Sequence, residues 1–365
     1  MQEFLTIAME YVTHCHGTCQ TCVLSRSERA ERSPHTKLCN ITKGIEAIAS
    51  SYAGAQSVAL GIGRANILDL EKADLDNIQS IIQTAERNLS FHKGYAEITT
   101  SLIGKINSQI QKAQYLMTRN SNSAFDMRFV VVGNTALLST KYWQNLRHFM
   151  SEISSMRRGV HDQVEDSGDI LQLALSCETL PNIDGVLDQF PGHRSVINIV
   201  WAPSYDKALN CSSVLRKMEE WLAEFYVKSR DRGIDASFIE RVDNALKDVD
   251  ISHKDAIEKA QESCDSITFI DADGNWHNGQ FTILAELDPI RFDREGLQVG
   301  MKHRALADAN SLFRNKECRR CEFRPACISS GAFKFVNMIN KRLKGQVSGC
   351  PAGIRKTFEI GAGYV

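Results

Sequence analysis

Residues 1–205 alternate between short apolar runs and longer stretches in which apolar positions follow a helical period. The short runs are rich in β-branched and aromatic residues, which is typical of buried strands. The longer stretches place apolar side chains three or four positions apart, as Ile41, Ile45 and Ile48 do, and so predict helices with one apolar face. The predicted strands are 4–13, 57–62, 95–101, 128–133, 170–176 and 196–201, and the predicted helices are 40–53, 74–88, 104–118 and 140–157.

This alternation predicts an α/β fold with a parallel sheet, because strands joined through helices form βαβ units. Six such strands suggest a partial barrel, and ligands of parallel α/β folds gather at the carboxyl ends of the strands. The rest of the chain predicts helices at 212–229 and 236–262, a hairpin of 266–271 with 280–285, and a helix at 302–315. We therefore expect three parts, at residues 1–205, 206–265 and 266–365.

The composition is ordinary for a soluble globular protein, with 43% hydrophobic and 24% charged residues in a chain of 365. The chain contains no apolar run of about 18 residues, the length that a membrane span needs. Its N-terminus lacks the basic segment of a signal peptide. A net charge of −1 argues against a general nucleic-acid-binding surface. We therefore expect a cytoplasmic protein that binds neither membranes nor nucleic acid.

The chain contains eleven cysteines, and seven of them fall into two groups near its ends. A disulfide scaffold would be short and secreted, with cysteines spread throughout. Grouped thiolates in a reducing compartment indicate a metal site instead. The other four cysteines are expected to be buried, since a free cysteine behaves as a small hydrophobic residue; they are Cys39, Cys177, Cys211 and Cys264.

Cys15, Cys19 and Cys22 form the first group, with the spacing C-x3-C-x2-C directly after the first predicted strand. Three thiolates on one loop can ligate three irons of a cubane cluster and leave the fourth iron open. Ferredoxin loops differ, because they supply a fourth cysteine close by. Zinc is the alternative, since His14 and His16 could complete a tetrahedral site.

A cysteine loop of this spacing after the first strand of a six-strand series resembles the radical S-adenosylmethionine (SAM) superfamily. The resemblance implies a (βα)6 partial TIM barrel in which Cys15, Cys19 and Cys22 are catalytic and hold a 4Fe-4S cluster that binds SAM. Such enzymes cleave SAM reductively to methionine and a 5′-deoxyadenosyl radical, which abstracts hydrogen from the substrate. One residue departs from the family pattern, because Thr21 stands where an aromatic residue usually precedes the third cysteine.

Five residues match SAM-binding positions of the family by their place after strands. Gly61 and Gly63 follow the second strand, where the family's glycine-rich motif meets the SAM amino group, although the motif's acidic residue is absent here. Asn134 follows the fourth strand, where the ribose is contacted, and Ser176 and Glu178 follow the fifth strand. The alternative is that the glycines form a tight turn and that Asn134 is a turn residue.

The second cysteine group comprises Cys318, Cys321 and Cys327, in the spacing C-x2-C-x5-C, followed by the more distant Cys350. Four thiolates are enough to saturate a cubane cluster, which would then carry electrons or support the structure. Arginines beside these cysteines suit a cluster, because cations stabilise its anionic core. A four-cysteine zinc site is the alternative.

This tail resembles the α+β SPASM extension of radical SAM enzymes, which occurs in anaerobic sulfatase-maturating enzymes and in maturases of ribosomal peptides. Its four cysteines match the ligands of the second auxiliary cluster of that extension, whereas Gly331 stands where the pattern has a further cysteine. A turn of the expected kind occupies 271–275, but no cysteine follows it closely. The resemblance therefore implies one auxiliary 4Fe-4S cluster in an SPASM-like domain at 266–365, after a helical connector at 206–265.

The resemblance further implies an oxidoreductase-like enzyme that acts on a peptide or protein side chain, by crosslinking, oxidation or epimerisation. Its partners would be an electron donor such as flavodoxin or ferredoxin and, because only 14 residues precede Cys15, a separate peptide-recognition protein. A radical SAM enzyme that acts on a small metabolite is one alternative. A zinc-stabilised binding protein without catalysis is the other.

Overall fold

The computed structural model describes the sheet, most of its helices and the second cysteine group. The residues that it describes are 2–9, 11, 37–51, 54–63, 66–102, 104–134, 140–160, 170–175, 180–188, 196–201, 212–234, 237–264, 267–270, 276–277, 315–330, 349–350 and 353–363.

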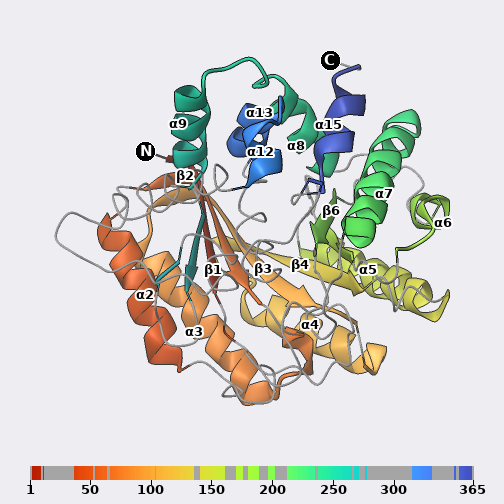
Figure 1. Cartoon of the computed structure of the whole chain (residues 1–365). Coiled ribbons are helices and arrows are strands. Elements are labelled where there is room, and N and C mark those ends of the chain that lie inside the picture. Colours follow the sequence, from red (N-terminus) through yellow and green to blue (C-terminus); the bar gives the residue numbers. More distant parts are fainter. Residues whose placement is uncertain are drawn as a thin grey trace.

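An eight-stranded sheet lies at the centre of the molecule, with the strand order β6-β5-β4-β3-β2-β1-β7-β8 (Figure 1). The first six strands along the chain lie side by side in sequence order, and each is parallel to the next. The predicted α/β class and its parallel sheet are therefore confirmed. These strands are β1 (Gln2–Met9), β2 (Ala55–Ile62), β3 (Phe91–Thr100), β4 (Phe125–Asn134), β5 (Ile170–Leu175) and β6 (Val196–Trp201).

Two further strands extend the sheet on the other side of β1. β7 (Ile267–Ile270) is parallel to β1, and β8 (Trp276–His277) is antiparallel to β7. The predicted hairpin is present, but its second strand begins at Trp276, earlier than predicted, while 280–285 lies outside the described residues. The local pattern of a four-residue strand does not specify its neighbour, so its pairing with β1 could not be predicted.

Four long helices follow the first four strands in turn and form a row along one face of the sheet (Figure 1). A shorter helix, which the sequence did not predict, follows β5. The five helices are α2 (Leu38–Ser51), α3 (Lys72–Asn88), α4 (Ile106–Arg119), α5 (Thr140–Val160) and α6 (Ile183–Leu187), and a single 3-10 turn, η1 (Ile67–Asp69), precedes α3.

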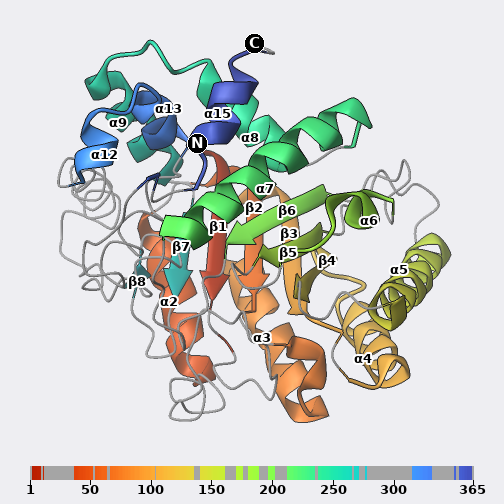
Figure 2. The same ribbon diagram turned by 45° about the vertical axis from the view of Figure 1, so that its right-hand side comes forward.

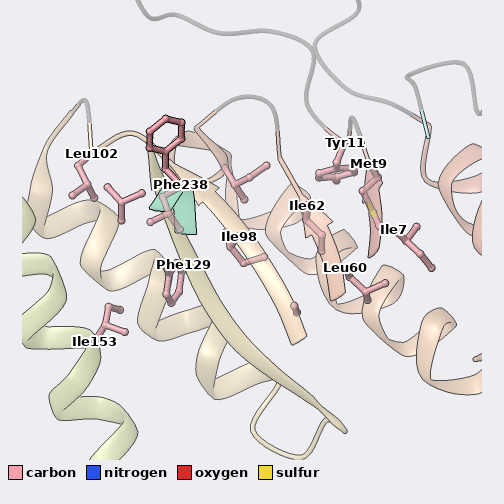
Figure 3. Packing of buried hydrophobic residues seen from close by; sticks show 14 of the residues in the cluster. Ile7, Met9, Tyr11, Leu60, Ile62, Ile98, Leu102, Phe129, Ile153 and Phe238 are labelled. Atoms are coloured by element: carbon pink, nitrogen blue, oxygen red, sulfur yellow. The ribbon is translucent and has the colours of Figure 1, made fainter. Parts of the chain in front are cut away.

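Alternate residues of the strands pack against these helices and form the hydrophobic core (Figure 3). Along β1 and β2 the buried positions include Ile7, Met9, Leu60 and Ile62, each no more than 1% exposed. Side chains that alternate with them belong to the opposite face of the sheet, because successive residues of a strand point to opposite sides. The sheet therefore has one apolar face toward the helices and a second face of different composition.

Six helices make up the C-terminal half of the described chain. They are α7 (Ser212–Asp231), α8 (Ser237–Leu246), α9 (His253–Cys264), α12 (Lys316–Arg319), α13 (Arg324–Ser329) and α15 (Arg355–Gly361). The prediction of one helix over 236–262 is wrong, because a turn separates α8 from α9. Ser252 Oγ accepts a hydrogen bond from the backbone N–H of Asp255 over 3.1 Å and so caps the start of α9. Of the helix predicted at 302–315, residues 302–314 lie outside the described residues.

The C-terminal helices pack around one another at one end of the sheet. α13 contacts α8 and α9, and α15 contacts α7 and α8. α9 directly precedes β7, which is parallel to β1, so α9 ends where these strands begin. Figures 1 and 2 accordingly place α9, α12 and α13 beyond the amino ends of β1 and β7, at the end opposite to the strands' carboxyl ends.

Cys39 lies exposed in the first turn of α2, so the prediction that it is buried is wrong. The buried face of α2 carries Ile41, Ile45 and Ile48, and a residue two positions before Ile41 lies on the other side of a helix. Cys177, Cys211 and the side chain of Cys264 lie outside the described residues. Among the helices described, none is both long and apolar enough to cross a bilayer.

Candidate functional site

The carboxyl end of β2 carries the two glycines that the sequence singles out. Gly61 is the next-to-last residue of β2, and it is paired with Ala8 of β1 and with Glu97 of β3. Gly63 follows the strand, is buried, and donates its N–H to the carbonyl oxygen of Met9 over 3.3 Å. The structure therefore places both glycines at the edge of the sheet where β1 ends.

Gly63 is required by close packing, because a methyl group at this position would overlap the Thr99 side chain of β3. Gly61 differs, since a Cβ there would meet only Ala8 among the described residues, at 3.4 Å from Cα and 3.5 Å from Cβ. The alternative interpretation, in which the glycine has a structural role, thus has direct support at Gly63. At Gly61, in contrast, the described residues leave room over the sheet for a small group.

The other N-terminal candidates are only partly described. Asn134 is the last residue of β4 and pairs with Ala174 of β5, so its backbone lies at the same carboxyl edge as Gly63. Ser176 and Glu178 lie outside the described residues. The loop of Cys15, Cys19 and Cys22 also lies outside them, and along the chain it begins six residues after Met9, the end of β1.

A polar pair supports the turn that follows β3. Thr100 donates its hydroxyl proton to Asn66 Oδ1 over 2.8 Å, and both residues are at most 8% exposed. Leu102, two residues later, has a φ of 52°, in the left-handed region that a leucine rarely adopts. The turn after β3 is therefore held in a specific conformation beside the glycine segment of β2.

Sequence reasoning missed three polar residues on the face of the sheet that α2–α5 do not cover. Residues of β3 alternate in burial, so that Ala96 and Ile98 are buried against the helices whereas Tyr95 and Glu97 belong to the opposite face. Arg128 of β4 is the cross-strand partner of Glu97. The sequence signal for this face is a glutamate that stands between apolar residues in a predicted strand.

Burial raises the pKa of the Glu97 carboxyl above its ordinary value, and the charge of Arg128 opposes that rise. The Arg128 guanidinium lies over the ring of Tyr95, 3.4 Å from the ring centroid, in a cation–π contact. Perturbed ionisable groups of this kind concentrate at functional sites, although structural pairs also produce them.

The second cysteine group is built from two short helices and a turn. Asn315 caps α12, because its side chain accepts hydrogen bonds from the N–H groups of Glu317 and Cys318 over 2.9 and 3.3 Å. Cys327 lies in α13 and donates its N–H to the Phe323 carbonyl over 2.9 Å. Cys350 begins a turn that closes onto the N–H of Gly353 over 3.0 Å. Cys350 nevertheless lies close enough to Cys318, 32 positions away in the sequence, to act on it by charge.

All four cysteines of this group are free thiols that influence one another electrostatically. Burial, followed by the charges of Cys350 and Cys321, raises the pKa of Cys318 to about 12. Burial, followed by the charges of Cys350 and Cys318, raises the pKa of Cys327 well above its ordinary value. Because four half-buried thiolates repel one another, the ionised set requires a positive core to hold it together.

Two arginines partly compensate for this negative charge. Arg324 in α13 lowers the pKa of Cys318 by its charge, and it donates a hydrogen bond from Nη1 to the Arg319 carbonyl over 3.1 Å. Arg355, at the start of α15, interacts electrostatically with Cys321. The thiol group therefore has cationic neighbours from two different helices.

Two kinds of metal site are built from four cysteine thiolates, a cubane iron–sulfur cluster and a tetrahedral zinc site. Within the described part of the chain, no three His, Cys, Asp or Glu side chains converge closely enough to hold a single ion. Tetrahedral zinc with Zn–S bonds of about 2.3 Å brings its sulfur atoms to within about 3.8 Å of one another. A cubane cluster has ligands on separate irons, so its thiolates are farther apart. Four thiolates are the donor set of a saturated cubane cluster and also of a four-cysteine zinc site.

No protein-family model and no curated protein sequence matches the chain. Solved structures share its fold. The anaerobic sulfatase-maturating enzyme anSMEcpe with bound SAM aligns with 94% of this chain and 100% of its own, at a TM-score of 0.54 and 8% identity. A second anSMEcpe structure, with SAM and a peptide bound, covers 89% of this chain and 88% of its own, at a TM-score of 0.55 and 10% identity.

SuiB of Streptococcus suis, bound to SAM, shares this fold as well. The alignment covers 89% of this chain and 72% of SuiB, at a TM-score of 0.52 and 11% identity. The chain therefore has the fold of radical SAM enzymes whose structures contain SAM. At such low identity the likeness concerns the fold, and the chemistry must be argued from the residues of this chain.

Proposed function

We propose that this chain is a radical SAM enzyme that generates a 5′-deoxyadenosyl radical and abstracts hydrogen from a peptide or protein side chain. One combination of observations carries the proposal. The fold is shared with SAM-bound radical SAM enzymes over most of the chain, and a C-x3-C-x2-C loop follows β1 in the sequence. Neither the fold nor the spacing alone would specify this chemistry.

In this proposal β1–β6 and their helices form a (βα)6 partial barrel over residues 1–205. Residues 206–265 are the helical connector, and an SPASM-like extension lies within 266–365. The strand order of the first six strands supports the barrel, because consecutive parallel strands with helices on one face are what such a barrel contains. The four-cysteine group supports the extension.

Cys15, Cys19 and Cys22 hold the catalytic 4Fe-4S cluster in this proposal. When bound there, the cluster supplies one electron to SAM, whose sulfonium bond then breaks to give methionine and the 5′-deoxyadenosyl radical. The residues of the chain orient SAM and exclude water and other hydrogen donors. Gly61 and Gly63 meet the amino-acid part of SAM, and Asn134, Ser176 and Glu178 stand where the ribose and adenine are contacted.

The second group, Cys318, Cys321, Cys327 and Cys350, holds one auxiliary 4Fe-4S cluster. Its helices α12 and α13 lie beyond the amino ends of β1 and β7 (Figure 2), whereas the residues that we propose to contact SAM lie at or after the carboxyl ends of strands in the sequence. The eight residues of β1 span about 23 Å, at a rise of roughly 3.3 Å per residue. The auxiliary cluster therefore does not touch SAM, and its direct effect is to tie α12, α13 and the turn at Cys350 together.

Anaerobic reconstitution with iron and sulfide tests both cluster assignments. We expect about eight irons per chain, and about four after Cys15, Cys19 and Cys22 are all changed to alanine. Retention of the full iron load by the triple variant would show that these cysteines are not ligands. Stoichiometric zinc without iron would favour the zinc-stabilised binding protein.

A peptide or protein substrate is favoured over a small metabolite, because an anSMEcpe structure of the same fold contains a bound peptide. As partners we propose an electron donor such as flavodoxin or ferredoxin and a separate peptide-recognition protein, and as location the cytoplasm. A gene for a short peptide beside the gene for this chain would support the peptide substrate. Genes for sugar or nucleotide biosynthesis in that place would support the metabolite.

A further inference from the structure

Glu97 belongs to a row of four cross-strand neighbours on the face of the sheet that α2–α5 leave uncovered. The row runs from Ala8 in β1 through Gly61 in β2 and Glu97 in β3 to Arg128 in β4. Neighbouring strands lie about 4.8 Å apart, so a side chain in this row can reach over the next position. On the side of β1 and β2, Glu97 therefore faces two residues without bulky side chains.

The surface over Gly61 is open among the described residues. A Cβ on Gly61 would have only Ala8 within 4 Å, and these contacts, at 3.4 and 3.5 Å, are of ordinary length. Gly61 itself is only partly buried. A ligand group can therefore lie beside the Glu97 carboxylate without displacing a described side chain.

Arg128, on the other side of Glu97, acts on its carboxylate by charge and contacts the ring of Tyr95. Its guanidinium stacks on Tyr95, which lies two residues before Glu97 on the same strand and hence nearer the amino end of β3. A largely buried carboxylate is costly unless a cation lies close to it. Among the described residues, the open side of Glu97 faces Ala8 and Gly61, so a second cation can approach the carboxylate from that side.

We propose that Glu97 binds the ammonium group of a ligand that lies over Ala8 and Gly61. The inference rests on the proposed function for the identity of that ligand, since the ammonium belongs either to SAM or to an amine of the substrate. The glycine segment after β2 lacks the acidic residue that the resemblance predicts. Glu97 supplies a carboxylate to the same place from the neighbouring strand, because it is paired with Gly61.

Glu97→Gln tests the proposal, because the variant keeps the size of the side chain and removes its charge. Asp126→Asn is the matched control, since Asp126 is an exposed carboxylate of β4 paired with Tyr95. The ligands are SAM, S-adenosylhomocysteine and 5′-methylthioadenosine, which lacks the amino-acid part. Affinities are measured by calorimetry on the anaerobically reconstituted protein.

If the ammonium is that of SAM, Glu97→Gln lowers the affinity for SAM and for S-adenosylhomocysteine at least tenfold. The affinity for 5′-methylthioadenosine stays unchanged. A loss of affinity for both ligands would identify the amino group as the partner of Glu97. The sulfonium charge is excluded as the partner, because S-adenosylhomocysteine does not carry it. Asp126→Asn changes none of the three affinities. An equal loss for 5′-methylthioadenosine would overturn the proposal, because it would mean that Glu97 acts through the fold.

If the SAM affinity is unchanged, the second arm uses n-butylammonium as probe and n-butanol as neutral control, measured by saturation-transfer NMR. Binding of n-butylammonium that Glu97→Gln abolishes would assign the site to a substrate amine. Insensitivity to Glu97→Gln in both arms would overturn the proposal. If the chain were not a radical SAM enzyme, the result would differ, because the wild-type protein would then bind none of the three adenosyl ligands.

Discussion

Gly63 and Thr99 are packed so closely at the carboxyl ends of β2 and β3 that a methyl group on Gly63 would overlap Thr99 Oγ1. Gly61, two residues earlier, meets only ordinary contacts from Ala8. The two glycines of one short segment thus have different roles. Gly63 permits the close approach of two strands, whereas Gly61 leaves space over the sheet.

Gly63→Ala should therefore destabilise the fold, while Gly61→Ala should not. Overpacking at a buried site costs typically about 1–3 kcal/mol, and we expect Gly63→Ala to lower the free energy of unfolding by that amount. Gly61→Ala should change it by less than about 1 kcal/mol and weaken SAM binding instead, because its methyl group enters the open surface. Urea unfolding and SAM calorimetry measure the two effects, and equal effects of both variants would contradict this division.

Removal of the second thiol group should destabilise the C-terminal helices without abolishing SAM cleavage. In the variant Cys318→Ala with Cys321→Ala, the iron content should fall by about four per chain, because two ligands of one cubane cluster are lost. The melting temperature should fall as well, since α12 and α13 lose the bridge to the turn at Cys350.

Cys39→Ala is the control for this experiment, because Cys39 is an exposed free thiol on α2. It should leave the iron content and the melting temperature unchanged. A double variant at Cys318 and Cys321 that retained all its iron would show that the four-cysteine group ligates no cluster.

Arg324 should raise the reduction potential of the auxiliary cluster, because its positive charge lies close to Cys318 and stabilises the more negative, reduced form. Arg324→Gln should lower the midpoint by about 40 mV, which corresponds to a screened charge interaction of ~1 kcal/mol for one electron. Redox titration followed by electron paramagnetic resonance measures the shift. Arg320→Gln, at an exposed position, is the control, and an equal shift there would argue against a specific role of Arg324.

Tyr226 in α7 links two helices through a buried polar contact. Its hydroxyl donates to Asp243 of α8 and accepts from Arg230 Nη1 over 3.0 Å. Burial, and then the hydrogen bond to Asp243, raise the pKa of Tyr226 from 10.0 to about 12. The protonated phenol is therefore favoured in the folded state, so this stabilisation is complete below pH 10 and is lost as the pH rises from 10 to 12.

Tyr226→Phe should cost about 1–2 kcal/mol of unfolding free energy near neutral pH, because Asp243 loses its hydrogen-bond donor. The difference between wild type and Tyr226→Phe should narrow above pH 10, where the tyrosine of the unfolded chain is ionised. Urea unfolding at several pH values between 8 and about 12 follows this difference. A difference that stays constant over this range would contradict the pKa shift.

The strands and long helices of the first part follow from its apolar periodicity, because that pattern specifies which face of each element is buried. The break between α8 and α9 could not be predicted from this pattern. Its charged, helix-favouring residues continue past Leu246, and the break depends on local capping by Ser252. Likewise, β7 is too short for its sequence to specify that it lies beside β1.

The candidate site shows the same contrast. Cysteine spacing identifies the members of each thiol group, because ligands on one loop must be close in sequence. The convergence of Cys350 with Cys318 depends on tertiary packing, so the sequence grouped them by the count of thiolates that one cubane cluster needs and by the family resemblance. Glu97 could not be predicted as a site residue, because its surroundings are set by its cross-strand neighbours Gly61 and Arg128, which are distant in sequence.

Formation of 5′-deoxyadenosine tests the central claim most directly. The reconstituted protein is incubated anaerobically with SAM and dithionite, and the products are separated by liquid chromatography. We expect 5′-deoxyadenosine and methionine in equal amounts, and neither product from the variant in which Cys15, Cys19 and Cys22 are alanine. A fully iron-loaded protein that formed no 5′-deoxyadenosine, or a triple variant that formed as much as wild type, would contradict the central claim.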